Sequence, residues 1–182
     1  MPAHAILHGM TPVLETDRLI VRQWTENDAE AAYAIFGDPD VMRFVGDTGE
    51  PHPDIEFTRE RLRVRNDKWS GVTGLGNWAV VEKHSGDVIG GGGLALLEDL
   101  DEVEVFYHFR KASWGHGYAT ELTRGLLDYG FAHLEKNRLI GLAYPANTAS
   151  HRVMTKAGMT HLGLRHAYGA DLEYFEVSRP IG

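Results

Sequence analysis

The sequence predicts a single α/β domain built around one mixed sheet. Its 182 residues, 43% of them hydrophobic, are enough to bury one core of ordinary domain size. Two apolar segments, Trp78–Val81 and Val88–Gly90, flank a glycine-containing turn, which indicates an antiparallel hairpin. A helical pattern separates the strand-like segments 101–109 and 138–143, and strands joined by a helical crossover run parallel. We therefore expect a sheet that is mostly antiparallel, contains one parallel pair and is flanked by helices.

The N-terminal half is predicted to contain one strand and three helical segments before the hairpin. Apolar residues alternate over residues 15–23, which is typical of a strand. Thr25 is a favourable helix cap, and the helix that follows is expected to stop at Gly37. Pro39 can begin a short helical turn. A longer helix is expected over residues 54–69, where charged and apolar residues alternate.

The C-terminal half adds further strands and one short helix. Four consecutive glycines, Gly90 to Gly93, interrupt the second strand of the hairpin and indicate either a β-bulge or a position where backbone and ligand come close, of which we favour the bulge. Asn147 or the residue after it can cap a helix that ends at Gly158. The segments 161–165 and 172–178 have the composition of final strands.

The most informative motif is a glycine turn that leads from the strand 101–109 into an amphipathic helix. The turn reads WGHGYAT over residues 114–120, and apolar residues follow it at helical spacing. Gly115 and Gly117 allow the backbone to approach a ligand closely. The free N–H groups and the positive dipole at the helix start can face an anion. Strand, glycine turn and helix in this order predict a pyrophosphate-binding site.

Composition excludes several classes of site. The chain has no cysteine, so disulfides, thiolate zinc sites and cysteine nucleophiles are ruled out. Its histidines form no HExxH or comparable cluster, and we expect no metal. A net charge of −8 argues against a general affinity for nucleic acid, and no segment suits a signal peptide or a membrane span. We expect a cytoplasmic protein with one domain over residues 1–182 and a core at about 13–180.

Three blocks in order resemble the GNAT superfamily of acyl-CoA-dependent N-acetyltransferases, most closely the branch that includes the ribosomal-protein N-terminal acetyltransferases. The blocks read ETDRLIVR at residues 15–22, WGHGYATE at 114–121 and NTASHRVMTKAGM at 147–159. The pyrophosphate signature of the superfamily usually begins with Gln or Arg, whereas this chain has Trp114 there. Main-chain amides make most of the contacts to the pyrophosphate, so this departure leaves the expected cofactor unchanged.

The resemblance implies that acetyl-CoA, as co-substrate, binds in a V-shaped opening between the strand that ends near Phe109 and the parallel strand that ends near Tyr144. The pyrophosphate would lie on the amides of the glycine turn. Asn147 and Ser150 would face the pantetheine or the thiol, although Asn147 could equally be a helix cap alone. The His116 ring could touch a phosphate or be exposed. The full set of expected cofactor-binding residues is Tyr107, His108, Phe109, Trp114, Gly115, His116, Gly117, Tyr118, Ala119, Thr120, Asn147 and Ser150.

Direct acetyl transfer to an amine requires a base for the amine and a proton for the departing CoA thiolate. Glu104 is the first candidate for the base, because it lies in a Val-Glu-Val strand context where its pKa could be raised. Alternatively, Glu102 and Glu104 could both coat one solvated strand face. Tyr144 and Ser150 are the candidates for protonating the thiolate, since both are expected next to the thiol.

The acceptor is expected to be a primary amine, either a protein N-terminal α-amine or a small amine. Two alternatives stay open: an aminoglycoside or polyamine, which an acidic protein would suit, and an acyl-CoA-binding module without turnover. Acceptor choice is expected to depend on residues 54–69 and on the loop 168–171. We expect no nucleic acid or membrane partner, and a homodimer is left open.

Overall fold

The computed structural model describes residues 11–45, 49–68, 73–97 and 100–179. Its strands are β1 (Leu14–Glu15), β2 (Leu19–Arg22), β3 (Gly76–Glu82), β4 (Val88–Leu97), β5 (Glu102–Phe109), β6 (Arg138–Ala143), β7 (Thr160–Ala167) and β8 (Ala170–Ser178). Its helices are η1 (Glu26–Asp28), α2 (Ala29–Phe36), α3 (Pro39–Met42), α4 (Ile55–Lys68), η3 (Lys111–Ser113), α5 (Tyr118–His133) and α6 (Thr148–Lys156).

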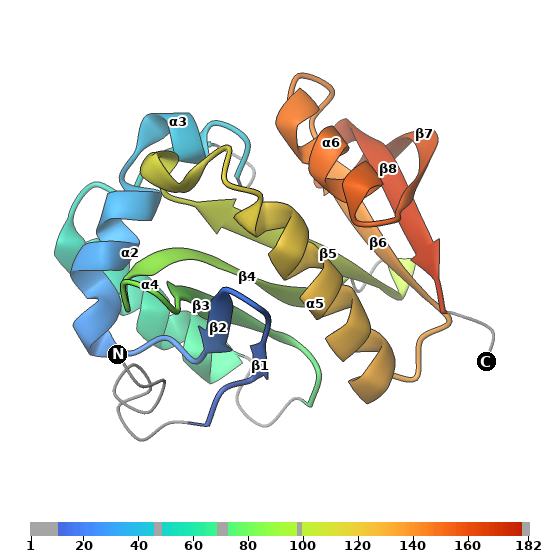
Figure 1. Ribbon diagram of the computed structural model, residues 1–182. Coiled ribbons are helices and arrows are strands. Elements are labelled where there is room, and N and C mark those ends of the chain that lie inside the picture. Colours follow the sequence, from blue (N-terminus) through green and yellow to red (C-terminus); the bar gives the residue numbers. More distant parts are fainter. Residues whose placement is uncertain (1–10, 46–48, 69–72, 98–99, 180–182) are drawn as a thin grey trace.

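The strands form one eight-stranded sheet in the order β1-β2-β3-β4-β5-β6-β8-β7. Every neighbouring pair is antiparallel except β5 and β6, which are joined through α5 and run parallel. Figure 1 shows α5 lying across one face of this sheet, with the C-terminal strands and α6 grouped at one end. The predicted mixed sheet with a single parallel pair is therefore confirmed.

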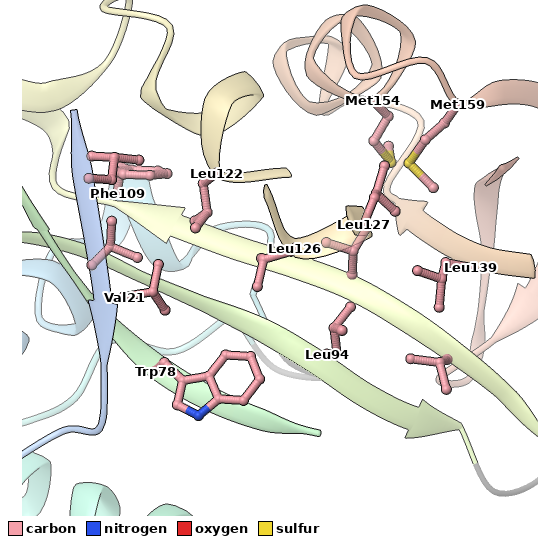
Figure 2. Close-up of a cluster of buried hydrophobic side chains, with 14 of the residues drawn as sticks. Val21, Trp78, Leu94, Phe109, Leu122, Leu126, Leu127, Leu139, Met154 and Met159 are labelled. Carbon is pink, nitrogen blue, oxygen red and sulfur yellow. The ribbon is translucent and has the colours of Figure 1, made fainter. Parts of the chain in front are cut away.

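Two apolar layers hold helices on both faces of the sheet. Alternate residues of β2 point to opposite sides, so Leu19 and Val21 join the layer under α5 while Ile20 packs with α2 and α4. All four residues of β2 are buried for this reason. In Figure 2, Leu122 and Leu126 of α5 lie over the strands that carry the first layer. Each such leucine stabilises the fold by about 1.5–3 kcal/mol through removal of apolar surface from water.

The predicted first strand is divided in two by a tight turn. The main-chain N–H of Thr16 donates to the carbonyl of Leu19 at 3.0 Å, and the Leu19 N–H donates to the Thr16 hydroxyl at 3.1 Å. The turn folds β1 back onto β2 as a short antiparallel pair. The alternation of apolar residues does not predict this turn, because the Thr16 hydroxyl that closes it lies within an otherwise regular strand pattern.

The helix starts agree with the caps expected from the sequence. Thr25 and Asp28 form a capping box, and Asp28 also receives a bidentate, buried ion pair from Arg22 at 2.7 and 2.8 Å. Asp54 caps α4 by accepting the Phe57 N–H at 2.7 Å. The expected end of that helix at Trp69 lies outside the described residues. None of the described helices is long and apolar enough to cross a membrane.

The predicted bulge lies beside the glycine run and not within it. Gly90 to Gly93 pair in unbroken register with Phe109 to Phe106 of β5. The irregularity lies one residue earlier, where the register of β3 shifts between Val80 and Val81 and leaves Ile89 without a ladder partner on β3. Close packing requires glycine within the run, because a Cβ on Gly93 would lie 1.8 Å from the carbonyl oxygen of Gly76.

The glycine run yields a stability prediction. Gly93→Ala should lower the free energy of unfolding by about 3 kcal/mol or more, because the backbone of β3 must move away to admit the methyl group. Gly91→Ala is the matched control on the same strand. Its Cβ would meet the Trp24 ring at 2.8 Å, so a smaller loss of about 1–2 kcal/mol is expected. Urea unfolding measures both, and wild-type stability in Gly93→Ala would contradict the close approach.

Candidate active site

The site is organised around the point where β5 and β6 separate. Their parallel ladder contains one register pair, Glu104 with Ile140. Beyond that pair the strands diverge toward Phe109 and Ala143, and Figure 1 shows β6 turning away from β5 toward α6. Separation of two adjacent strands leaves main-chain groups on their inner edges available to a ligand. The predicted V-shaped opening therefore has a structural counterpart.

A buried ionic cluster surrounds Glu102, close to the point of separation. Glu102 is 4% exposed and forms ion pairs with Arg138 of β6 and, at 2.7 Å, with Arg165 of β7. The Tyr174 hydroxyl approaches the same carboxylate at 3.4 Å. The alternative in which this strand face is solvated is wrong, because the C-terminal strands cover it. Glu102 is a fully neutralised carboxylate that ties β5 to the neighbouring strands.

Glu104 is buried on the same face without a cationic partner. Its residue exposure is 8%, and no Lys, Arg or His in the described part of the chain lies within ion-pair distance. Burial raises the pKa of Glu104 to about 7, although hydrogen bonds from the Tyr168 hydroxyl and the Leu142 N–H partly oppose the rise. The Tyr168 hydroxyl lies 2.8 Å from Oε2. Glu104 is thus poised to take up a proton near neutral pH.

The glycine turn presents free N–H groups at the start of α5. Gly115 and Gly117 have left-handed backbone angles, φ +80° and +82°, which few other residues adopt. The first main-chain donor bonded within the helix is Glu121, to the carbonyl of Gly117 at 3.1 Å. The N–H groups of Gly115 and of residues 117–120 donate to no main-chain acceptor in the described part of the chain. Such a cluster at a helix N-terminus is suited to a phosphate.

Side chains around the turn fix its shape. The indole N–H of Trp114 donates to the carbonyl of Phe109 at 2.8 Å, while the residue as a whole is 47% exposed. Tyr118 stacks on Phe109 with ring centroids 6.4 Å apart. The His116 ring is exposed and lies 2.9 Å from the Trp114 carbonyl through Nδ1. The expected contact of this ring with a phosphate stays a prediction.

Arg18 and Glu121 also hold the turn, although neither was predicted as a site residue. Arg18 donates to the Glu121 carboxylate through Nε at 2.6 Å and through its main-chain N–H at 2.8 Å. Its Nη1 donates to the carbonyl of His116 at 3.0 Å. The Thr16 hydroxyl completes the set at 2.6 Å from Glu121. Arg18 and Glu121 lie in two of the sequence blocks that carry the family resemblance, and only the folded structure shows that they contact each other.

Residues on the α6 side of the opening take separate positions. Asn147 caps α6, because its side-chain oxygen accepts the Ser150 N–H at 3.2 Å. The cap was one of the two roles expected for this residue. Burial raises the pKa of Tyr107 to about 12, and the nearby Ser150 hydroxyl offsets part of that rise. The Tyr107 hydroxyl oxygen is buried without a well-formed hydrogen bond to any described residue. Tyr107 of β5 and Ser150 of α6 therefore meet across the opening.

Tyr144 and His108, also predicted for the site, make ring contacts with phenylalanines. The Tyr144 ring lies 6.2 Å from Phe44, and its carbonyl accepts the N–H of Asn147 at 2.8 Å. His108 packs on Phe36 at 5.2 Å, on the face of the sheet that bears Glu104. Among the described residues, no three His, Asp or Glu side chains gather as metal ligands would.

Comparison with known proteins identifies relatives over most of the chain. A family model described as an acetyltransferase (GNAT) domain matches residues 18–160. The uncharacterized N-acetyltransferase YoaA of Bacillus subtilis is 31% identical over 160 residues, which cover 87% of this chain and 89% of YoaA. A solved GNAT acetyltransferase from Bacillus anthracis has a TM-score of 0.77 at 24% identity and covers 91% of this chain and 97% of its own.

A further solved structure bears on the narrower resemblance. The ribosomal L7/L12 α-N-protein acetyltransferase RimL has a TM-score of 0.76, with 92% of this chain and 98% of RimL covered. Its sequence identity is only 13%, so the likeness extends to the fold alone. The resemblance to the ribosomal-protein branch stays a prediction.

The environment of Glu104 predicts a pH-dependent difference in stability. Because the folded-state pKa is raised to about 7 from 4.5, the folded protein binds the proton more tightly than the unfolded chain. The stabilisation is complete below about pH 4.5 and is lost as the pH rises through 7. Glu104→Gln cannot ionise, so its stability relative to wild type should rise by about 3 kcal/mol between pH 4 and pH 8. Urea unfolding at both pH values measures it, and parallel curves would contradict the burial argument.

Proposed function

The chain belongs to the GNAT acetyltransferase family, and from this premise we propose that it transfers the acetyl group of acetyl-CoA to a primary amine, either a protein N-terminal α-amine or a small amine. We propose a single domain over residues 1–182 for this reaction. One observation supports the proposal most strongly: a buried carboxylate without a cationic partner, Glu104, lies where β5 and β6 separate. It shares that opening with a cluster of free main-chain donors at the start of α5.

In the proposed complex, the pyrophosphate of acetyl-CoA lies on the N–H groups of residues 115–120. The positive end of the α5 dipole and the left-handed glycines favour an anion there. The pantetheine runs between β5 and β6, beside the backbone of residues 107–109. The thioester then lies near the first turn of α6, where Ser150 faces Tyr107.

The acetyl transfer is direct. Glu104 takes a proton from the acceptor ammonium, and the neutral nitrogen attacks the thioester carbonyl carbon. A C–N bond forms and the C–S bond breaks, while Glu104 releases the first proton to solvent. The attacking nitrogen, which has become positively charged, loses its second proton, and a hydroxyl group that gives up one proton and takes this one passes a proton to the CoA thiolate. Ser150 is favoured over Tyr144 as the donor of that proton, because the Tyr144 ring packs against Phe44 while Ser150 meets β5 across the opening. No covalent enzyme intermediate is required.

The pKa of the base favours an α-amine over a lysine side chain. An α-ammonium has a pKa of about 7.7–8.0, within about one unit of Glu104, so the proton transfer is nearly balanced. A lysine ammonium with a pKa of about 10.4 would have to lose its proton at a cost of about 5 kcal/mol. Glu104 in its present surroundings therefore suits the weaker bases among primary amines.

The proposed pyrophosphate position raises an electrostatic difficulty that Arg18 resolves. Glu121 places a carboxylate in the first turn of α5, next to the site of the anion. Without a compensating charge, this carboxylate would cancel part of the positive potential at the start of the helix and would repel the diphosphate. Arg18 donates hydrogen bonds to that carboxylate and to the carbonyl of His116. It therefore neutralises the charge of Glu121 and also fixes the shape of the turn.

A double-mutant cycle tests this role of Arg18. Arg18→Gln should raise the Kd for acetyl-CoA by about tenfold, since the Glu121 charge is then exposed to the diphosphate. Glu121→Gln should change the Kd by less than about threefold, and the double variant Arg18→Gln/Glu121→Gln should recover most of the loss. Isothermal titration calorimetry measures all three. A double variant as weak as Arg18→Gln would instead mean that Arg18 contacts the cofactor directly.

The proposed activity is tested by cofactor binding followed by turnover. Acetyl-CoA should raise Tm, and free thiol should appear with unblocked peptides or small amines as acceptors. Glu104→Gln should lower turnover by about 100-fold or more with the Kd for acetyl-CoA unchanged. Because the base must be ionised, kcat/KM of the wild type should rise with pH through about 7, and the variant should lack that limb.

The acceptor panel also separates the alternatives. Thiol release with aminoglycosides or polyamines but not with peptides would replace the α-amine acceptor. Stabilisation by acetyl-CoA without thiol release from any amine would identify an acyl-CoA-binding module and overturn the proposal.

A further inference from the structure

The C-terminal hairpin reaches over the two buried carboxylates of β5. In the sheet, β6 and β8 separate β7 from β5. Nevertheless Arg165 of β7 pairs with Glu102, and Tyr168 at the hairpin tip donates to Glu104. The hairpin must therefore curve across the sheet face, and its tip covers the carboxylate that we assign as the base.

The tip has a backbone conformation that suits tyrosine poorly. Ala167 pairs with Ala170, so Tyr168 and Gly169 form a two-residue turn. Their φ angles are +53° and +73°, as in type I′ hairpin turns, which favour Asn, Asp or Gly at the first position. A tyrosine there costs about 1–2 kcal/mol. Backbone strain of this kind persists where the surroundings compensate it, and it concentrates at functional sites.

The Tyr168 side chain connects solvent with the buried base. The residue is 55% exposed, yet its hydroxyl is hydrogen-bonded to a carboxylate that is 8% exposed. The ring therefore lies between solvent and the Glu104 carboxylate. The hydroxyl engages Oε2 and the Leu142 N–H also donates to the carboxylate, but each carboxylate oxygen has two acceptor positions, so Glu104 can still accept from an incoming ammonium group.

We propose that Tyr168 is a positioning residue, which holds the Glu104 carboxylate turned toward the acceptor amine. This inference rests on the proposed function, since it assigns Tyr168 a part in the proton transfer to Glu104. Tyr168 itself neither gains nor loses a proton in the step. The proton passes from the acceptor nitrogen to the Glu104 carboxylate, and the Tyr168 hydroxyl keeps its hydrogen bond to Oε2.

The groups around Glu104 allow the contribution of Tyr168 to be isolated. Donation by the hydroxyl favours the ionised carboxylate, so Tyr168 lowers a pKa that burial raises. On the same face, the His108 ring of β5 packs on Phe36 and Phe106. The other charged and titratable groups surround Glu102 and come from β5, β6, β7 and β8: Glu102, Arg138, Arg165, Tyr174 and Glu176. The Tyr174 hydroxyl serves that neighbouring cluster and provides a matched control.

The test is an NMR titration of the free protein labelled with ¹³C at the glutamate carboxyl carbons. The Glu104 resonance is the one lost in Glu104→Gln. Tyr168→Phe should raise the titration midpoint of this resonance by about one pH unit. Tyr168→Asn should do the same, and its side chain suits the turn, so the fold is retained. Tyr174→Phe should leave the midpoint within about 0.2 units of wild type.

Turnover provides the second readout. With acetyl-CoA and an unblocked peptide, the acid limb of kcat/KM should move upward in Tyr168→Phe by the same amount as the NMR midpoint, with KM for acetyl-CoA unchanged. A Tyr168→Phe titration that superimposes on wild type would overturn the positioning role. A wild-type Glu104 that titrates near its ordinary pKa, or a fully active Glu104→Gln, would refute the proposed base itself.

Discussion

The parting of β5 and β6 after a single register pair is the constraint on which the rest of the structure depends. Parallel strands inside a sheet normally hydrogen-bond to each other along their whole length, whereas the ladder between β5 and β6 is limited to Glu104 and Ile140. The divergence is sustained because each strand keeps its other neighbour: β5 pairs with β4 over its full length, and β6 pairs with β8. The opening is therefore built into a sheet that is otherwise continuous.

The same parting explains why two glutamates on one strand face have different surroundings. Glu102 is closed in by Arg138 and Arg165. Glu104, two residues along, has the hydroxyl of Tyr168 and no described cation. Burial without neutralisation raises the pKa of Glu104 to about 7. In an N-acetyltransferase of the GNAT type, this separates a carboxylate that ties strands together from one that can exchange a proton.

The opening is completed by contacts from both ends of the chain. Arg18, near the N-terminus, braces the glycine turn through Glu121 and the carbonyl of His116. Tyr168, near the C-terminus, reaches Glu104 from the tip of the β7–β8 hairpin. Both contacts place a side chain from a distant segment beside main-chain donors or a carboxylate of the central strands. Arg18 and Tyr168 therefore fix the glycine turn and Glu104 from segments that are distant in the sequence.

The sequence by itself determined the features that depend on nearby residues: the mixed sheet, the Thr25 and Asn147 caps, and the glycine turn at Gly115 and Gly117 that opens α5. Its errors arose where distant segments decide. The sequence predicts a bulge within the glycines of β4, whereas the register shift lies at Ile89 and the backbone of β3 lies close against Gly93. The burial of Glu102 and Glu104, the Arg18–Glu121 contact across 103 residues and the Tyr168–Glu104 contact across 64 were settled only by the tertiary structure. Caps and turns are local hydrogen-bond choices, whereas burial and long-range pairing depend on which surfaces the folded chain brings together.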